Sequence, residues 1–361
     1  MAKKPAKVPE KYARRLTALR SAMRERDLGA YVVLDRKDQY YLTGFTGEDG
    51  AVLITSSRVT LLTDGRFDET ADIETPWAKK VVRKQRGADS YVKAIAATRV
   101  KVVGFDPNHM NVLTFSELKK RLKPIDLKAA SGLVTELRLR KDASEIAAIR
   151  KAIKVAEDAF VATRRYIRAG ATEAEVAARL VFEMTSRGAS GPAFGPIVAA
   201  GANSSLPHYE PRNVKIRNNS IVLIDWGARV DWHISDLTRV VAIGSIPRKM
   251  ERVYQVVREA HDRAVAAARP GIAAGELDAV ARDHIRSAGF GDRFSHSLGH
   301  GIGLDVHEGP GLRVGATVKL EPGMVVTIEP GVYLPGVGGV RLENDVLITR
   351  EGAESLSSLP L

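Results

Sequence analysis

Two carboxylates in the C-terminal half of the chain lie eleven residues apart, Asp225 and Asp236 in DWGARVDWHISD. Asp225 follows the apolar run IVLI, which is typical of a buried strand, so we expect its carboxylate to be buried as well. A buried carboxylate must be neutral, paired or bound to a metal ion. Thr238 and Arg239 lie close behind Asp236 and are placed to orient or pair with it.

Glu329 and Glu343 repeat this pattern about a hundred residues later. Glu329 follows the run MVVTI, and Glu343 precedes a second apolar run, VLIT. Four acids that converge repel one another unless cations lie between them, and divalent ions with oxygen ligands meet that need. One such acid alone would be interpreted as a surface or ion-paired group. Four acids on matching apolar strands instead favour a metal site.

Four of the eight histidines lie in polar, glycine-rich segments. His208 lies in NSSLPHYEP, and the segment FSHSLGHGIGLDVHEGP contains His296, His300 and His307. A neutral imidazole completes a carboxylate site well and shifts its preference toward transition metals such as Mn, Co, Fe or Zn. The histidines therefore add both a candidate ligand and candidate substrate contacts.

An internal duplication predicts how these side chains are positioned. RAGATEAEVAARL (168–180) resembles RPGIAAGELDAVARDHI (269–285), with Gly170 and Glu175 at the spacing of Gly271 and Glu276. Each copy leads to two strands, and each strand carries one acid. We therefore expect an α+β domain with approximate twofold symmetry, in which helices flank an antiparallel sheet.

The N-terminal part alternates helices and strands and predicts an α/β domain with a mixed sheet. Helices are expected over 10–27 and 112–122, and strands over 30–35, 51–56, 59–64, 79–85 and 101–106. The sequence pattern changes near residue 137 from alternating helices and strands to one long expected helix, with Asp142 and Glu145 in a capping-box pattern. We place one domain at 1–136 and a second at 137–361.

Composition excludes several kinds of protein. The 361 residues contain no cysteine, which rules out disulfide scaffolds, iron–sulfur clusters and thiol nucleophiles. The net charge is +12, and residues 1–136 hold 26 of the basic and 17 of the acidic side chains. No aromatic residues accompany the basic ones in a binding motif, so a solvated surface is a better interpretation than a nucleic-acid site. No signal peptide or membrane span is expected, and we predict a cytoplasmic protein.

These motifs resemble those of a known group of enzymes. From about residue 140 onward, DWGARVDWHISDLTR, HSLGHGIGLDVHEGP, TIEPGVY and RLEND are similar to the pita-bread metallopeptidases: methionine aminopeptidase, aminopeptidase P, prolidase and creatinase. YYLTGFTG (40–47) resembles the creatinase/prolidase-type N-terminal domain. The resemblance covers nearly the whole chain and implies a pita-bread catalytic domain with two divalent metal ions, of which manganese is our first choice.

The resemblance also implies roles for individual residues. Asp236, His300, Glu329 and Glu343 would hold one ion, and Asp225 would hold the other, with Asp236 and Glu343 bridging. Two ions about 3.5–4 Å apart activate water and stabilise a developing oxyanion.

Further roles follow from the same resemblance. Glu329 would also carry the proton to the leaving amine. His208 and His307 would hydrogen-bond the substrate, and His296 would line the leaving-group side. Tyr333 and Arg341 are candidates for support of the metal ligands, and Glu308 and Asp345 are weaker ones.

The motifs narrow the choice within the group to two activities. Methionine aminopeptidases mostly lack the N-terminal domain, and creatinase does not need the five ligands. Aminopeptidase P and prolidase both cleave before proline. Some microbial prolidases have an arginine four residues after the equivalent of His307, where this chain has Gly311 with Arg313 nearby. We therefore expect an Xaa-Pro aminopeptidase acting on peptides with proline second.

Three alternatives stay open: an Xaa-Pro dipeptidase (prolidase), a non-catalytic binding protein of the same fold, and a hydrolase of other amides. A homodimer is expected from the resemblance.

Overall fold

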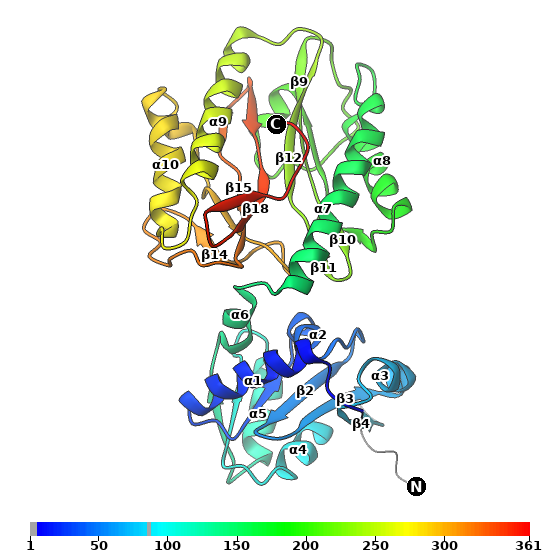
Figure 1. The fold of residues 1–361 in the computed structure, drawn as a ribbon. Coiled ribbons are helices and arrows are strands. Elements are labelled where there is room, and N and C mark those ends of the chain that lie inside the picture. The colour runs from blue at the N-terminus through cyan, green and yellow to red at the C-terminus, as the bar shows by residue number, and fades with distance from the viewer. Residues whose placement is uncertain (1–5, 85–87) are drawn as a thin grey trace. The chain divides into compact units, whose positions relative to one another are not determined.

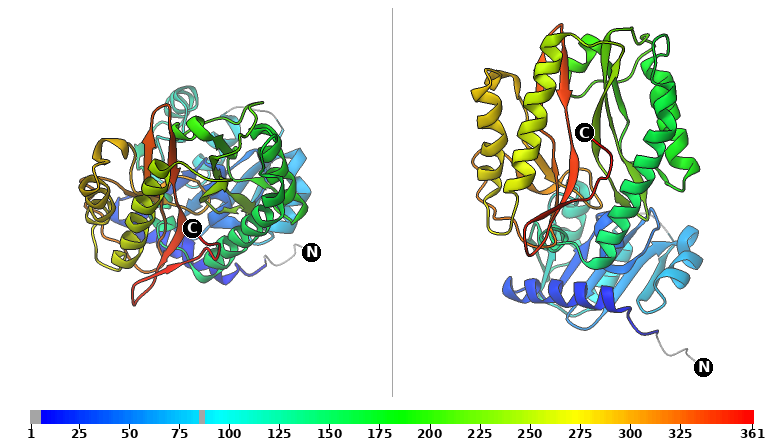
Figure 2. Two further views of the ribbon diagram at one scale, coloured as in Figure 1. Left: turned by 90° about the horizontal axis from the view of Figure 1, so that it is seen from above. Right: turned by 45° about the horizontal axis from the view of Figure 1, so that its top comes forward.

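The computed structural model describes residues 6–84 and 88–361, and these divide into two compact units between Leu137 and Arg138. Figures 1 and 2 show the ribbon from three directions. Each unit has its own hydrophobic core, so each is described by itself.

The first unit is an α/β domain built on a mixed sheet with the strand order β4-β3-β2-β1-β5-β6. β1 pairs antiparallel with β2 and parallel with β5. The strands are β1 (Ala30–Val33), β2 (Gly50–Thr55), β3 (Val59–Asp64), β4 (Lys79–Arg83), β5 (Val102–Phe105) and β6 (Asp126–Ala129). The helices are α1 (Glu10–Glu25), α2 (Arg36–Thr43), α3 (Asp68–Glu74), α4 (Asp89–Ala96), α5 (Val112–Arg121) and α6 (Leu133–Arg138).

Both helices predicted for this unit are present, as are all five predicted strands, within a few residues of the predicted ends. α1 buries Tyr12, Leu16, Leu19 and Met23, the apolar face that its spacing indicates. Residue 85, the last of the predicted strand 79–85, lies outside the described residues. The elements α2–α4, α6 and β6 were not predicted, because each is short.

The second unit contains four antiparallel sheets, of which two are β11-β10-β7 and β16-β17. The other two carry the site and lie between two pairs of helices (Figures 1 and 2). One sheet has the order β12-β9-β8, and the other has the order β14-β13-β15-β18-β19. The helices are α7 (Ala143–Thr163), α8 (Glu173–Ser186), α9 (Arg248–Ala267) and α10 (Ala274–Ser287). The strands are β7 (Gly191–Pro192), β8 (Ile197–Ala200), β9 (Ser220–Trp226), β10 (Ala228–Val230), β11 (His233–Ile234), β12 (Leu237–Ile243), β13 (Gly299–Gly301), β14 (Glu308–Leu312), β15 (Val325–Ile328), β16 (Gly331–Leu334), β17 (Gly338–Arg341), β18 (Asn344–Ile348) and β19 (Ala353–Ser355).

The duplication is visible in the backbone of the second unit. Gly170 and Gly271 both adopt left-handed conformations, with φ of 90° and 85°. Each glycine N–H donates to a carbonyl in an extended segment, that of Ile216 for Gly170 and that of Leu320 for Gly271. A residue with a side chain is strained at such φ values, which explains why glycine occupies the matching position in each copy.

The long helix expected from residue 137 is instead two helices. α6 ends at Arg138 and α7 begins at Ala143. The predicted capping box is confirmed: the Asp142 side chain accepts from the Ser144 and Glu145 N–H groups, and Glu145 accepts from the Asp142 N–H. Because a residue that caps a helix is itself extended, the cap at Asp142 ends the helical pattern that LRLR would otherwise continue.

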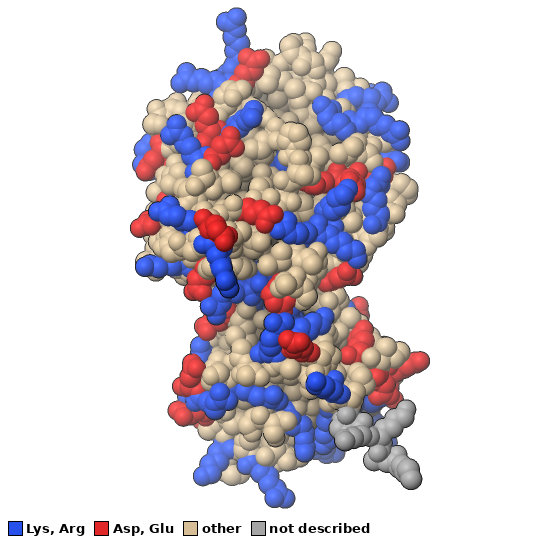
Figure 3. All heavy atoms as spheres, in the orientation of Figure 1, with Lys and Arg blue, Asp and Glu red and all other residues tan. Residues whose placement is uncertain are grey.

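The surface carries charges of both signs. On the face shown in Figure 3, most groups of Lys and Arg have Asp or Glu beside them. Within the described part of the chain, no helix combines the length and the apolar composition needed to cross a membrane.

Candidate functional site

Three of the predicted site residues meet in the second unit where its two sheets adjoin. Asp236 precedes β12, His300 lies in β13, and Glu343 lies between β17 and β18. Each offers one ligand atom, and these atoms all lie within 4.8 Å of one another. A backbone bridge between Thr238 and Glu343 joins the two sheets at this point. The cluster therefore has the size and donor types of a metal site.

Glu329 and His300 form a close pair beside this cluster. His300 Nε2 lies 3.2 Å from Glu329 Oε1 and 3.8 Å from Asp236 Oδ2. The other ring nitrogen, Nδ1, lies 3.1 Å from the Gly301 carbonyl oxygen, to which it can donate. Such a backbone contact fixes the ring and leaves Nε2 directed at the acids.

Two threonines orient the acids. Thr238 donates to Glu343 Oε2 at 2.6 Å. Thr327 donates to Glu329 Oε1 at 3.1 Å and accepts from the His300 N–H at 3.0 Å. Thr327 was not predicted as a site residue, because a threonine inside an apolar strand carries no signal of its own.

Asp225 is the start of a hydrogen-bonded chain that leads to His296. Arg341 Nη2 lies 2.5 Å from Asp225 Oδ2, and Arg341 Nη1 donates to the Tyr333 hydroxyl at 2.8 Å. That hydroxyl lies 2.8 Å from His296 Nε2, and His296 Nδ1 lies 2.8 Å from the Ser297 carbonyl oxygen. Nδ1 can donate to the Ser297 carbonyl, and in a neutral His296 the Tyr333 hydroxyl can then donate to Nε2. Consistent with this, burial lowers the pKa of His296.

Burial and mutual repulsion act on the acids in different ways. They raise the pKa values of Asp225, Asp236 and Glu343, through desolvation first and then through neighbouring carboxylates. Burial also acts to raise the pKa of Glu329, but the hydrogen bond and charge of His300 outweigh it and lower the pKa to about 2. One ionised acid thus stands among three that resist ionisation in the absence of a cation.

Arg239 does not act as the sequence suggested. Its guanidinium donates to the carbonyls of Thr238, Glu343, Leu359 and Pro360, and among the described residues it makes no hydrogen bond or ion pair with Asp236. Successive residues of a strand face opposite sides, so Thr238 faces the acids while Arg239 faces away.

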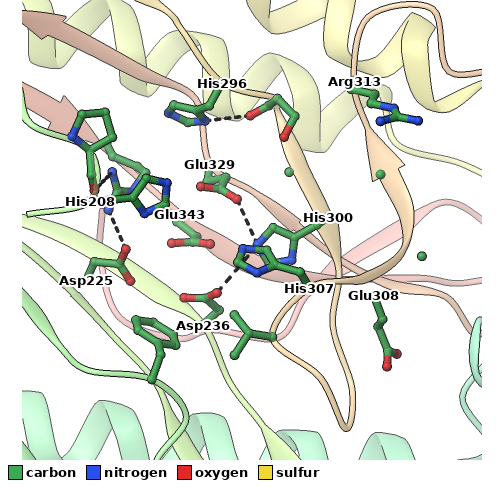
Figure 4. Close-up of a pocket in the computed structure, with 18 of the residues that line it drawn as sticks. His208, Asp225, Asp236, His296, His300, His307, Glu308, Arg313, Glu329 and Glu343 are labelled. Carbon is green, nitrogen blue, oxygen red and sulfur yellow. Dashed lines mark hydrogen bonds and ion pairs between the residues drawn. The ribbon is translucent and has the colours of Figure 1, made fainter. Parts of the chain in front are cut away.

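A cavity of about 1320 Å³ opens onto the acids. Figure 4 shows the acids together with His208, His296, His300 and His307 around this space. The His300 and His307 rings lie 4.3 Å apart between centroids. The cavity lining also includes Gly311 and Arg313, at the end of β14.

The two weaker candidates have structural contacts. Asp345 is fully buried and accepts from the Asp236 N–H at 3.1 Å, and burial raises its pKa to about 7. Glu308 pairs with Lys141 and Arg138, each at 2.6 Å. Asp345 therefore supports the Asp236 backbone, and Glu308 anchors the segment that carries His307.

The sequence as a whole matches two family models. The model of Metallopeptidase family M24 covers residues 147–350, and the Creatinase/Prolidase N-terminal domain covers residues 15–140. The chain belongs to Metallopeptidase family M24. It is therefore a peptidase of the metal-dependent type, with a pita-bread C-terminal domain, as the sequence motifs predicted.

Named relatives in family M24 include both activities that the motifs left open. A Xaa-Pro dipeptidase from Pyrococcus horikoshii is 36% identical over 93% of this chain and 94% of its own length. The structure of a Xaa-Pro dipeptidase from Bacillus anthracis matches with a TM-score of 0.94 at 36% identity, covering 97% of this chain and 98% of the other. An X-Pro aminopeptidase from Thermotoga maritima matches with a TM-score of 0.88 at 36% identity, covering 93% and 97%.

The residues present fit the divalent ions that family M24 membership implies. Asp225 Oδ1 and Asp236 Oδ1 are buried and have no hydrogen-bond partner among the described residues. Uncompensated buried carboxylate oxygens are costly, and a cation is the partner that three neighbouring acids lack.

The expectation of an Xaa-Pro aminopeptidase is less well supported than the alternative of an Xaa-Pro dipeptidase, because dipeptidases predominate among the relatives and solved structures that match this chain.

Proposed function

We propose that this chain is a metal-dependent dipeptidase that hydrolyses the peptide bond before proline in Xaa-Pro dipeptides. The observation that carries the proposal is the presence, in one cavity, of a buried acid cluster and an arginine without an ionic partner. The relatives named Xaa-Pro dipeptidase support the same activity. This replaces the sequence-based preference for longer peptides, while the homodimer and a cytoplasmic location remain predictions.

The metal ligands are proposed from the acids and one histidine. Asp236, His300, Glu329 and Glu343 would hold one divalent ion, and Asp225 would hold a second with Asp236 and Glu343 between them. Bound divalent ions supply Lewis acidity, which lowers the pKa of water and stabilises negative charge on the scissile carbonyl oxygen. Manganese stays our first choice because carboxylate-rich sites with one imidazole suit it.

Glu329 is the proposed carrier of the proton. An ionised Glu329 carboxylate can accept a proton from the attacking water. Proline's nitrogen carries no hydrogen in the peptide bond, so it must gain a proton as the carbon–nitrogen bond breaks. Transfer of the same proton from Glu329 to that nitrogen completes the hydrolysis.

The histidines around the cavity are proposed to hold the substrate. His208 and His307 would hydrogen-bond the substrate, including the oxygen of the scissile carbonyl. That oxygen gains negative charge as the tetrahedral intermediate forms, and the added charge strengthens these hydrogen bonds. His296 would contact the proline side, because its ring is fixed by Tyr333 and Ser297.

Arg313 is proposed to bind the dipeptide's carboxylate. Gly311 and Arg313 are two residues apart in an extended segment, so they face the same side, and both line the cavity. A side chain at 311 would meet only Arg313 Cδ, at 4.0 Å, so the space beside Gly311 is open to the arginine. The Arg313 guanidinium has no hydrogen-bond or ion-pair partner within the described residues, which leaves it free for an anion.

One observation favours the second candidate, an Xaa-Pro aminopeptidase. The cavity of about 1320 Å³ is larger than the roughly 300–1,000 Å³ of most small-ligand sites. It would accommodate residues beyond proline.

The test compares Gly-Pro with Gly-Pro-Gly, using protein stripped of metal and reloaded with Mn²⁺, for wild type and Arg313→Gln. We expect wild type to prefer the dipeptide. Loss of a charge-assisted hydrogen bond of about 1.5–3 kcal/mol should raise KM for Gly-Pro by about 10- to 100-fold in the variant. Arg350→Gln removes an exposed arginine outside the cavity lining and should change neither substrate.

A wild-type preference for Gly-Pro-Gly that Arg313→Gln leaves unchanged would establish the aminopeptidase instead. Hydrolysis of neither peptide by metal-loaded protein would favour another amide substrate or a binding protein.

A further inference from the structure

One buried carboxylate outside the metal site holds both ends of the segment that carries His208. Glu173 is the first residue of α8 and is fully buried. Its Oε1 accepts from the Ala200 N–H at 2.8 Å and from Asn203 Nδ2 at 2.9 Å. Its Oε2 accepts from the Tyr209 hydroxyl at 2.7 Å and from the Arg212 N–H at 3.3 Å.

These four bonds use the full acceptor capacity of the side chain. A carboxylate offers about four lone-pair sites and no donor, and four donors point at this one. Two donors come from the start of the segment and two from its end, so one side chain closes the segment 200–212 as a loop. The burial of Tyr209 and its hydrogen bond to Glu173 raise the pKa of that phenol to about 12, which keeps its hydroxyl a donor.

His208 depends on this loop more than the other cavity histidines do. Its imidazole has no hydrogen bond or ion pair among the described residues. His296, by contrast, is fixed through both ring nitrogens, and its carbonyl accepts from Arg282. The direction of the His208 ring is therefore set by the loop backbone. Glu173 holds that backbone together with three further bonds: from the Gly339 N–H to Ser204 Oγ at 2.8 Å, from the Ala174 N–H to the Arg212 carbonyl at 3.1 Å, and from Arg341 to the Pro207 carbonyl at 3.4 Å.

We propose that Glu173 is a positioning residue for catalysis, which acts by fixing the loop 200–212 so that His208 faces the substrate. The proposal rests on the proposed function, since it takes His208 as a substrate contact. It predicts that substitution of Glu173 and substitution of His208 remove the same interaction, the contact between His208 and the substrate.

The test is a double-mutant cycle of Glu173→Gln and His208→Ala, measured by hydrolysis of Gly-Pro with Mn²⁺. Glutamine has the same shape, but its amide group places a donor against two of the four donors. We expect Glu173→Gln to lower kcat by about 10- to 100-fold, the effect of a misplaced contact, with KM changing less and metal content unchanged. In the His208→Ala background the same change should cost less than about twofold.

Glu183→Gln is the matched control. Glu183 lies on the same helix and is also buried, but it pairs with Arg179 and Arg187. Its loss should leave kcat within about twofold in both backgrounds, because it does not contact the loop. If Glu173→Gln does not fold, Tyr209→Phe takes its place, since it removes one of the four donors to Glu173. Tyr209→Phe should lower kcat by less than Glu173→Gln would, and it should have no effect on kcat in the His208→Ala background.

Limited proteolysis gives a second measurement that does not depend on activity. Trypsin can cleave after Arg212 at the end of the loop, and Glu173→Gln should speed this cleavage at least about fivefold, while Glu183→Gln should not. Full additivity with His208→Ala, or unchanged cleavage after Arg212, would overturn the positioning role. Wild-type protein that fails to hydrolyse Gly-Pro would overturn the proposed function, and the cleavage rate would still decide whether Glu173 holds the loop.

Discussion

At the scale of single residues, the main physical feature of the site is the free-energy cost of placing several carboxylates close together in a buried position. Asp225, Asp236 and Glu343 are all buried, and burial and repulsion raise their pKa values. A carboxyl whose pKa is higher in the folded than in the unfolded protein lowers stability at neutral pH. The metal-free protein should therefore be strained at this cluster, and metal binding should relieve the strain.

Asp236→Asn tests this cost directly. We expect the metal-free variant to unfold at about 2–4 °C above metal-free wild type, which corresponds to about 1 kcal/mol for a unit of this size. Mn²⁺ should then raise the unfolding temperature of wild type but not of the variant, because a shared ligand is lost. Asp292→Asn, at an exposed position, is the control. An equal gain with Mn²⁺ in both proteins would argue against Asp236 as a ligand.

His307 is expected to act on the substrate and not on the metal. Its ring is exposed to the cavity, and burial together with the charge of His300 lowers its pKa, so it is neutral at physiological pH. His307→Ala should keep its metal content and mainly lose kcat, by about 10- to 100-fold. Metal analysis and steady-state kinetics check this, with His284→Ala on α10 as control. Loss of metal in His307→Ala would contradict the assignment.

At the scale of secondary-structure elements, packing of β9 on α7 holds Asp225 in place. Trp226 is fully buried, stacks on Phe160 with ring centroids 4.5 Å apart, and donates to the Ala156 carbonyl. Since Trp226 directly follows Asp225, the stacked pair fixes the strand that presents this acid.

Phe160→Ala should lower the free energy of unfolding by about 3–5 kcal/mol, because it leaves a cavity against Trp226. Phe182→Ala on α8 is the matched control, since its ring is 57% exposed and its loss should cost about 0.5 kcal/mol or less. Urea unfolding of the metal-free proteins measures both. Equal losses in the two variants would show that the stacked pair does not hold β9.

Element boundaries also show what a sequence can predict. The acids were found because each stands beside an apolar run, and the cap at Asp142 because its pattern is local. β10, β11, β16 and β17 have only two to four residues, too few for a periodic signal. The role of Glu173 was hidden, because a glutamate in the first turn of a helix needs no explanation beyond the helix dipole.

At the scale of the whole second unit, the C-terminal residues 357–361 connect α7 to the strands that carry the acids. Glu157 on α7 accepts from the hydroxyls of Ser357 and Ser358 and from the N–H groups of Ser358 and Leu359. Arg239 donates to the carbonyls of Leu359 and Pro360 and also to that of Glu343. This connection was not predictable, because SSLPL has no periodicity and no motif.

The hydrogen bonds to Glu157 predict a dependence of stability on pH. Burial acts to raise the pKa of Glu157, but the bonds from the 357–359 segment outweigh it and lower the pKa below the ordinary 4.5. A carboxylate with a lowered pKa stabilises the folded state above the unfolded pKa, and this contribution is lost as pH falls through the lower, folded value. Glu157→Gln should therefore be less stable than wild type at pH 7, by about 1 kcal/mol, and the difference should shrink below about pH 4.5.

Asp158→Asn, next along α7, separates this effect from a general change of charge, because the Asp158 side chain is half-exposed and pairs only with Lys154 among the described residues. It should show a difference from wild type that varies little between pH 4 and pH 7. Urea unfolding at both values measures all three proteins. If Glu157→Gln stays as far below wild type at pH 4 as at pH 7, the C-terminal segment is held by the shape of the side chain and not by its charge. Its link to Glu343 through Arg239 would then not respond to acid.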